Sequence, residues 1–196
     1  MLQNLVFFGA AIQLGGALIY VKETLAGYAK PNKITFLMWS IAPFIAATAA
    51  FANGARWVIL PIFMAGFGPL LVFIVSFKNP KSFWKLNLFD YLCGIFSLLA
   101  LILWMITREP AVAIFFAIIS DLFAAIPTLI KSWKFPETES HWIYTTSIFG
   151  PLTGLLAIKQ WQFSEYAFSI YLLAIDCALA FFVIRKSIIN LFKSQK

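Results

Sequence analysis

Apolar residues along this chain gather in long runs, and polar or charged residues separate each run from the next. About 20 consecutive apolar residues form an α-helix long enough to cross a bilayer. Seven runs reach or approach this length, which predicts an all-α polytopic membrane protein with seven transmembrane helices in a single transmembrane domain. These runs cover residues 5–27, 34–52, 57–77, 88–107, 111–133, 141–158 and 165–185.

Composition agrees with this pattern. Hydrophobic residues make up 62% of the 196 residues and charged residues 12%, whereas soluble domains average about 25% charged residues. The formal net charge of +7 does not indicate nucleic-acid binding, because the basic residues lie in short clusters between apolar runs. Cys93 and Cys177 lie inside apolar runs, and His141 is the single histidine, so we expect no metal site and no cofactor.

The distribution of lysine and arginine predicts the orientation. If alternate loops face opposite sides, three of the 15 basic residues, Arg56, Arg108 and Lys159, share a side with the N-terminus, and the other twelve lie opposite. Cytoplasmic loops carry the excess of positive charge. The sequence therefore predicts an integral membrane protein, of the bacterial inner (plasma) membrane, with the N-terminus outside and the C-terminus cytoplasmic.

An internal repeat emerges at an offset of 105 residues. It predicts repeat one at about 5–77, a linker helix at about 88–107 and repeat two at about 111–186. Because the linker adds one membrane crossing between two three-helix units, the two repeats are parallel. This 3+1+3 plan is typical of transporters whose solute sites lie near the midplane between the repeats. The matched pairs are Tyr28 with Trp133, Pro31 with Pro136, Thr35 with Ser140, Trp39 with Tyr144, and Ser40 with Thr145.

The segment from Asp121 through Pro127 to Lys131, followed by Pro136, together with the 3+1+3 plan and the outside N-terminus, resembles the SWEET and PQ-loop superfamily of seven-helix membrane proteins. Prolines at 43, 127 and 151 match places where that family has prolines in its repeats. The resemblance implies a transporter fold, and it includes cargo receptors as well as transporters.

Two aspartates are the strongest candidates for a solute site. Asp121 and Asp176 each lie about ten residues inside a predicted span, where an Asp costs about 2.5–3.5 kcal/mol on insertion. Such a residue is hidden from lipid and has a partner. It serves either as a proton acceptor or solute-binding group in a central cavity, or as a structural hydrogen-bonding group to a Ser, Thr or Tyr of a neighbouring helix.

Four polar and aromatic residues extend this predicted site. Trp39 and Tyr144, which the repeat relates, are candidates to stack on a solute or to close a gate, and Ser40 and Thr145 follow them in sequence. Core packing is the alternative for this set, and anchoring at the membrane interface is a further alternative for Trp39.

Three prolines within spans are candidate hinges. A proline deletes a backbone hydrogen bond and loosens a helix, so Pro43, Pro127 and Pro151 suit a rocking motion, with a static kink as the alternative. The charged stretch after the fifth span is expected to be a solvated turn, because exposed ion pairs contribute under about 1 kcal/mol. Its residues are Lys131, Lys134, Glu137 and Glu139. Gating through changing salt bridges is the alternative.

These features favour a secondary transporter or facilitator that moves a small polar solute by alternating access. The alternative is a non-transporting membrane receptor or sorting protein of the same fold. The chain has neither an HExxH nor a GxSxG motif, so we do not expect an enzyme. The expected partners are the solute and the lipid bilayer, and a homo-oligomer is left open.

Overall fold

The structure, a computed structural model, describes residues 5–52, 59–82, 84–106, 110–157, 161 and 163–194. Every element in these ranges is a helix and none is a strand, which confirms the predicted all-α class. The elements are α1 (Leu5–Ala26), α2 (Lys33–Ala52), α3 (Ile59–Val75), η2 (Pro80–Ser82), α4 (Leu88–Ile106), α5 (Pro110–Lys134), η3 (Pro136–Thr138), α6 (His141–Ser147), α7 (Phe149–Ala157) and α8 (Phe163–Ser194).

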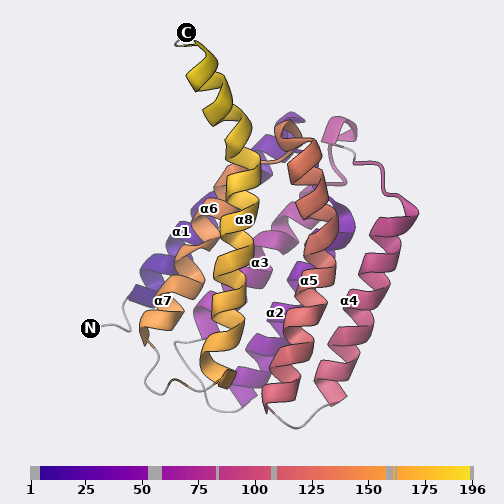
Figure 1. Cartoon of the computed structure of the whole chain (residues 1–196). Helices are drawn as coiled ribbons and strands as arrows, with labels where there is room; N and C mark the ends of the chain where they lie inside the picture. Colours follow the sequence, from indigo (N-terminus) through magenta and orange to yellow (C-terminus); the bar gives the residue numbers. More distant parts are fainter. Residues whose placement is uncertain are drawn as a thin grey trace.

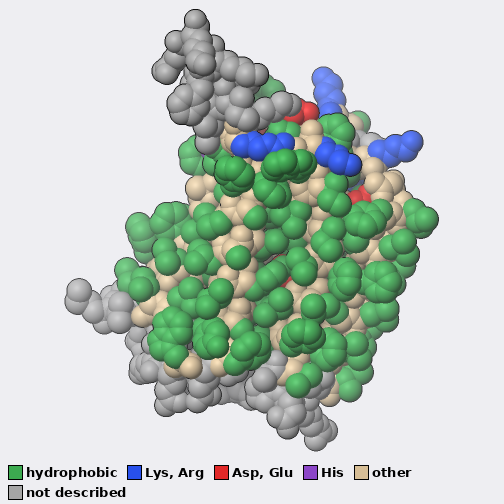
Figure 2. Space-filling model, in the orientation of Figure 1, with side chains coloured by type: hydrophobic (Ala, Val, Ile, Leu, Met, Phe, Trp, Pro, Cys, Tyr) green, Lys and Arg blue, Asp and Glu red, His purple; other side chains and the backbone are tan. Residues whose placement is uncertain are grey.

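Three segments are long and apolar enough to cross a membrane: Leu5–Ala26, Ile114–Lys134 and Tyr166–Arg185. Leu60–Val75 and Leu88–Leu103 are shorter apolar helices. Figure 2 shows a face of the bundle covered by hydrophobic side chains, with lysine and arginine gathered at one end. An apolar lateral surface of this kind indicates a membrane protein, because soluble proteins rarely expose large continuous apolar patches.

The helices form one bundle and alternate in direction along the chain, except that α7 continues in the direction of α6 (Figure 1). Helices α1 and α5 run the same way, and both finish at the end where α2, α4 and α6 begin. We call this the Lys-rich end, because its connecting segments or adjoining helix turns hold Lys30, Lys78, Lys81, Lys85 and Lys134. The cations predicted for the opposite side, Arg56, Arg108 and Lys159, lie outside the described residues.

Helix neighbours follow a recurring pattern. In the first half of the chain, α3 packs against both α1 and α2; in the second half, α8 packs against α5 and against α6 and α7. The halves meet where α1 contacts α6 and α7, and where α2 contacts α5. Helix α4 packs against α5 and α2, so it lies beside both halves.

The sixth predicted span is not one helix. Residues 141–158 were expected to form a single span, but α6 ends at Ser147 and α7 starts at Phe149, with Ile148 between them. Pro151 explains the break, because it has no N–H to donate to the carbonyl of Ser147, four residues earlier. The last helix also differs from its prediction, since α8 continues beyond residue 185 to Ser194.

Small residues bring α1 close to α6 and α7. A Cβ atom built on Gly16 would overlap the Thr146 hydroxyl, and one built on Gly9 would lie 2.9 Å from Thr153 Oγ1. Small residues at such positions let helix backbones approach closely in membrane proteins. The two glycines therefore fix how the N-terminal helix fits against the second half of the chain.

Candidate functional site

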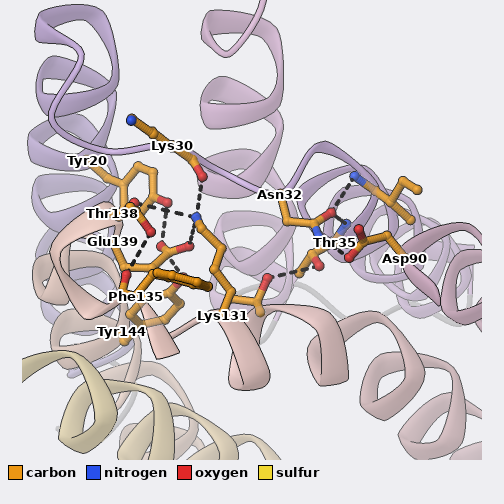
Figure 3. Close-up of polar contacts among 12 residues, drawn as sticks. Tyr20, Lys30, Asn32, Thr35, Asp90, Lys131, Phe135, Thr138, Glu139 and Tyr144 are labelled. Carbon is orange, nitrogen blue, oxygen red and sulfur yellow. Dashed lines mark hydrogen bonds and ion pairs between the residues drawn. The ribbon is translucent and has the colours of Figure 1, made fainter. Parts of the chain in front are cut away.

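A buried ion pair lies at the Lys-rich end. Lys131 Nζ, in the last turn of α5, lies 2.5 Å from Glu139 Oε1, and the two side chains are 1% and 0% exposed. The same ammonium donates to the main-chain carbonyl of Lys30 and, at 3.5 Å, to that of Thr138 (Figure 3). A buried charge is tolerated when it is paired and its remaining hydrogen-bonding positions are filled, and both conditions hold here.

The second oxygen of Glu139 joins two further helices. Glu139 Oε2 accepts hydrogen bonds from Tyr20 Oη of α1 at 2.5 Å and from Tyr144 Oη of α6 at 2.8 Å. We call Tyr20, Lys131, Glu139 and Tyr144 the Glu139 network. One carboxylate thereby connects α1, α5 and α6, and charge-assisted hydrogen bonds of this kind are about twice as strong as neutral ones.

This network corrects the interpretation of the charged stretch after α5. Lys131 and Glu139 were expected in a solvated turn, and that expectation was wrong for both of them. It holds for Lys134 and Glu137, whose side chains are exposed. The turn folds back through η3, which carries Glu139 inward under the ends of α1 and α5.

Four aromatic rings pack together beside the network. Ring centroids lie 5.2 Å apart for Tyr20 and Phe36, 5.6 Å for Phe36 and Trp39, and 6.4 Å for Trp39 and Tyr144. Tyr20 and Tyr144 close the set at 6.5 Å. The structure thus brings Trp39 and Tyr144, the aromatic pair proposed from the repeat, into direct contact. We call these four residues the aromatic cluster, and Tyr20, Phe36 and Tyr144 in it are buried.

Asp121 lies deeper in the bundle, ten residues before Lys131 on α5 and therefore about 15 Å from it along the helix. Its side chain is buried, and its Oδ2 accepts a hydrogen bond from Tyr171 Oη of α8 at 2.8 Å. The indole N–H of Trp39 lies near the same carboxyl without hydrogen-bond geometry, and it has no other partner among the described residues. Trp39 therefore belongs to the aromatic cluster and also lies beside Asp121.

Asp176 of α8 belongs to the same region. It is close enough to Asp121, Tyr144 and Tyr171 to interact with them electrostatically. Within the described part of the chain, neither aspartate forms an ion pair with a lysine, arginine or histidine, and no hydrogen bond to Asp176 is found. Among the described residues, a buried carboxyl, Asp121, and a half-buried one, Asp176, thus lie in a region that contributes aromatic rings and hydroxyl groups but no cation that pairs with them.

The two hydroxyl residues of the predicted site differ. Ser40 is buried and donates to the carbonyl of Phe36 in its own helix at 2.6 Å, so its hydrogen is already used. The Thr145 hydroxyl is buried and has no hydrogen-bond partner among the described residues. Thr145 is thus the member of this pair with a hydroxyl left to bind a further group.

The three candidate hinge prolines occupy different surroundings. Pro43 and Pro127 lie inside the continuous helices α2 and α5, whereas Pro151 follows the break before α7. Near Pro127, the carbonyl of Ala124 accepts a hydrogen bond from Thr35 Oγ1 at 2.8 Å. A neighbouring side chain thus adds a hydrogen bond beside the proline, as is common in membrane helices.

A second polar cluster at the Lys-rich end was not found from the sequence. Asn32 Oδ1 accepts from the backbone N–H groups of Ile34 and Thr35 at 3.1 and 3.3 Å, which caps α2. Its Nδ2 donates to Asp90 Oδ1 at 2.8 Å, and Asp90 also exchanges backbone–side-chain hydrogen bonds with Asn87 at the start of α4. The spacing of Asn87 and Asp90 is a capping signal that was available in the sequence.

Comparison with known proteins finds no match: no protein-family model, no curated protein and no solved structure is similar to this chain. The geometry of the aspartate pair and of the Glu139 network is therefore the basis on which a function is proposed.

Proposed function

We propose that the protein is a secondary transporter or facilitator, which moves a small polar solute across a membrane by alternating access. The observation that carries this proposal is that two acidic residues of α5 and α8, the buried Asp121 and the half-buried Asp176, lie close enough to interact. Acidic residues inside membrane helices are costly, and they commonly mark solute or ion pathways. With Tyr171 and Trp39, the carboxyls offer acceptors, an indole donor and aromatic faces to a polar solute.

Helix packing supports the 3+1+3 arrangement of two parallel repeats. In each half the third helix, α3 or α8, contacts both of the others. The first helix of each half also contacts the second span of the other half: α1 contacts α6 and α7, and α5 contacts α2. Two similar units related by a shared axis make contacts of this reciprocal kind. This packing favours grouping the chain with the SWEET and PQ-loop superfamily, with α4 as the linker helix and seven spans in all. In such folds the solute site lies at the interface between the repeats.

The Glu139 network and the aromatic cluster connect α1, α2, α5 and α6 at the Lys-rich end. In the proposed cycle these contacts close that end. In the proposed cycle, opening this end breaks the contact between Lys131 and Glu139 and separates Tyr20 from Tyr144. By the positive-inside rule we place this end in the cytoplasm, with the N-terminus outside.

The test is solute counterflow in proteoliposomes that contain the purified protein, with panels of labelled sugars, amino acids and vitamins at several pH values. We expect exchange of at least one class. Asp121→Asn should abolish it, and Tyr171→Phe should lower it at least tenfold, because a hydrogen bond to a charged group contributes about 1.5–3 kcal/mol. Tyr166→Phe is the matched control on α8, since Tyr166 contacts Trp161 and Phe163 instead.

Silence across the whole panel at every pH would refute transport, and saturable binding without exchange is what the receptor alternative predicts. Full exchange by a folded Asp121→Asn variant would move the solute site elsewhere in the bundle. Thermal unfolding of each variant, compared with the unsubstituted protein, separates loss of exchange from loss of fold.

A further inference from the structure

A small pocket lies at the Lys-rich end, between the start of α4 and the last turns of α5. Its volume is about 140 Å³, and its lining includes Trp84, Phe89, Asp90, Lys131, Lys134 and Phe135. This volume suits a group the size of a phosphate ester with a few attached atoms. The pocket lies beside α4, whereas Tyr171 reaches Asp121 from α8, and Figure 1 shows these two helices on opposite sides of α5.

The pocket combines apolar walls with one exposed cation, Lys134, because the ammonium of Lys131, which is also in the lining, is already paired with Glu139. Trp84 and Phe135 form one wall, with ring centroids 5.7 Å apart, and Lys131 Nζ lies 4.8 Å from the centroid of the Trp84 ring. Two lysines and one aspartate are in the lining. Lys134 is exposed and forms no ion pair with any described residue, so its ammonium is available to an anion.

Asp90 limits which anion fits. Its oxygens already accept from Asn32 Nδ2 and from the N–H of Asn87, at 2.8 and 2.7 Å. A carboxylate has about four acceptor positions, so positions remain for an added donor. The site therefore favours binding of a ligand that places an anionic group near Lys134 and a hydroxyl group near Asp90.

Helix α4, which contributes Phe89 and Asp90 to the pocket, also carries a bare apolar surface. The outward face of α4 exposes a row of large hydrophobic side chains, and Figure 2 shows hydrophobic side chains on this side below the lysines of the Lys-rich end. The row includes Leu92, Ile95, Leu99, Ile102 and Met105. Acyl chains would lie along this face while a headgroup occupies the pocket.

We propose that this pocket binds the headgroup of an anionic phospholipid with a hydroxyl-bearing headgroup, such as phosphatidylglycerol. The phosphate contacts Lys134, the headgroup hydroxyls face Asp90 and Asn87, and the acyl chains follow α4. Basic pockets between transmembrane helices at the cytoplasmic side are typical sites for anionic lipid headgroups. This inference does not depend on whether the protein transports a solute.

The experiment uses delipidated protein in a nonionic detergent. Phosphatidylglycerol and phosphatidylcholine with identical acyl chains are titrated separately, and bound lipid is counted by native mass spectrometry while Tm is recorded. Separate arms add glycerol phosphate and inorganic phosphate without acyl chains. We expect one phosphatidylglycerol to bind preferentially and to raise Tm, because a ligand of the folded state stabilises it.

Lys134→Gln should weaken phosphatidylglycerol binding about fivefold, since each lysine near an anionic headgroup contributes about 1 kcal/mol. Lys22→Gln is the matched control, because Lys22 is also exposed but lies on α1, across the bundle from α4 (Figure 1). Equal binding of the two lipids, or equal losses in the two variants, would overturn the proposal. Stabilisation by inorganic phosphate equal to that by phosphatidylglycerol would also overturn it, in favour of a free-phosphate site.

Discussion

Replacing Lys131 by Met tests whether the Glu139 network holds the Lys-rich end together. Methionine keeps much of the length and apolar stem of lysine but removes the ammonium 2.5 Å from Glu139. Glu139 keeps its two tyrosine donors, yet its buried charge loses the cation beside it. Removing one partner of a buried ion pair costs about 3–5 kcal/mol. At about 2–4 °C per kcal/mol for a chain of this size, Tm should fall by about 6–20 °C.

The double variant makes the test specific to the pair. In Lys131→Met with Glu139→Gln, neither member of the pair is charged, and the glutamine oxygen still accepts from Tyr20 and Tyr144. Replacing both members of a buried pair is often close to neutral. The double variant should therefore be more stable than the Lys131→Met variant, and its loss should be smaller than the sum of the two single losses.

Thermal unfolding in detergent is the measurement, with Lys134→Met as the control. Lys134 lies one turn further along α5 and is exposed, so its replacement should change stability by no more than about 0.5 kcal/mol. If Lys131→Met and Lys134→Met unfold at the same temperature, the pair contributes nothing to stability. If the losses of the two single variants simply add in the double variant, Lys131 and Glu139 do not interact, and the proposed closure fails with them.

Two further predictions concern packing and capping. Gly16→Ala should destabilise the protein by about 1–3 kcal/mol, because the added Cβ overlaps Thr146. Gly15→Ala is the control and should not change stability, since nothing lies within 4 Å of its Cβ. Equal thermal stability of the two variants would contradict the close contact. Asn32→Ala should cost about 1–2 kcal/mol through the lost cap of α2 and the lost partner of Asp90; an unchanged Tm would contradict it.

The positions of the helices could be predicted from the sequence because apolar runs and their charged separators are local features. Helix α4 occupies Leu88–Ile106 where residues 88–107 were expected, and α1 and α2 agree as closely. The break at Ile148 was not predicted, although Pro151 had been singled out as a flexible point. A proline inside an apolar run indicates a weakened hydrogen bond, but whether the helix continues depends on its neighbours.

Part of the candidate site was also predictable from local sequence, because an aspartate inside an apolar run is easily recognised. The insertion cost of a mid-span aspartate identified Asp121 and Asp176 one at a time, and the tyrosine on a neighbouring helix was among the expected partners of such a residue. Which tyrosine fills that role depends on α5 packing against α8, because Asp121 and Tyr171 are 50 positions apart in the chain.

The burial of Glu139 is the feature of the site that was least predictable from the sequence. It lies in a short polar stretch with a proline, a composition typical of a solvated turn, and its burial depends on Tyr20, which is 119 positions away. No periodic pattern connects these positions, and the ion pair with Lys131 forms only because η3 folds the chain back under α5. Contacts of this kind follow from tertiary packing and not from local propensity.

The break at Ile148 and the Glu139 network together suggest how the Lys-rich end opens in the proposed cycle. Helix α6 spans only His141–Ser147, with extended backbone at Ser140 before it and the Pro151 break after it. It carries Tyr144, while α7 is held against α1 where Thr153 meets Gly9. In the proposed cycle, this short helix with a joint at each end swings away from α1 while α7 keeps its place. The movement requires that the bonds of Glu139 to Tyr20 and Lys131 break and that Thr146 separates from Gly16. It would take Tyr144 out of the aromatic cluster together with α6.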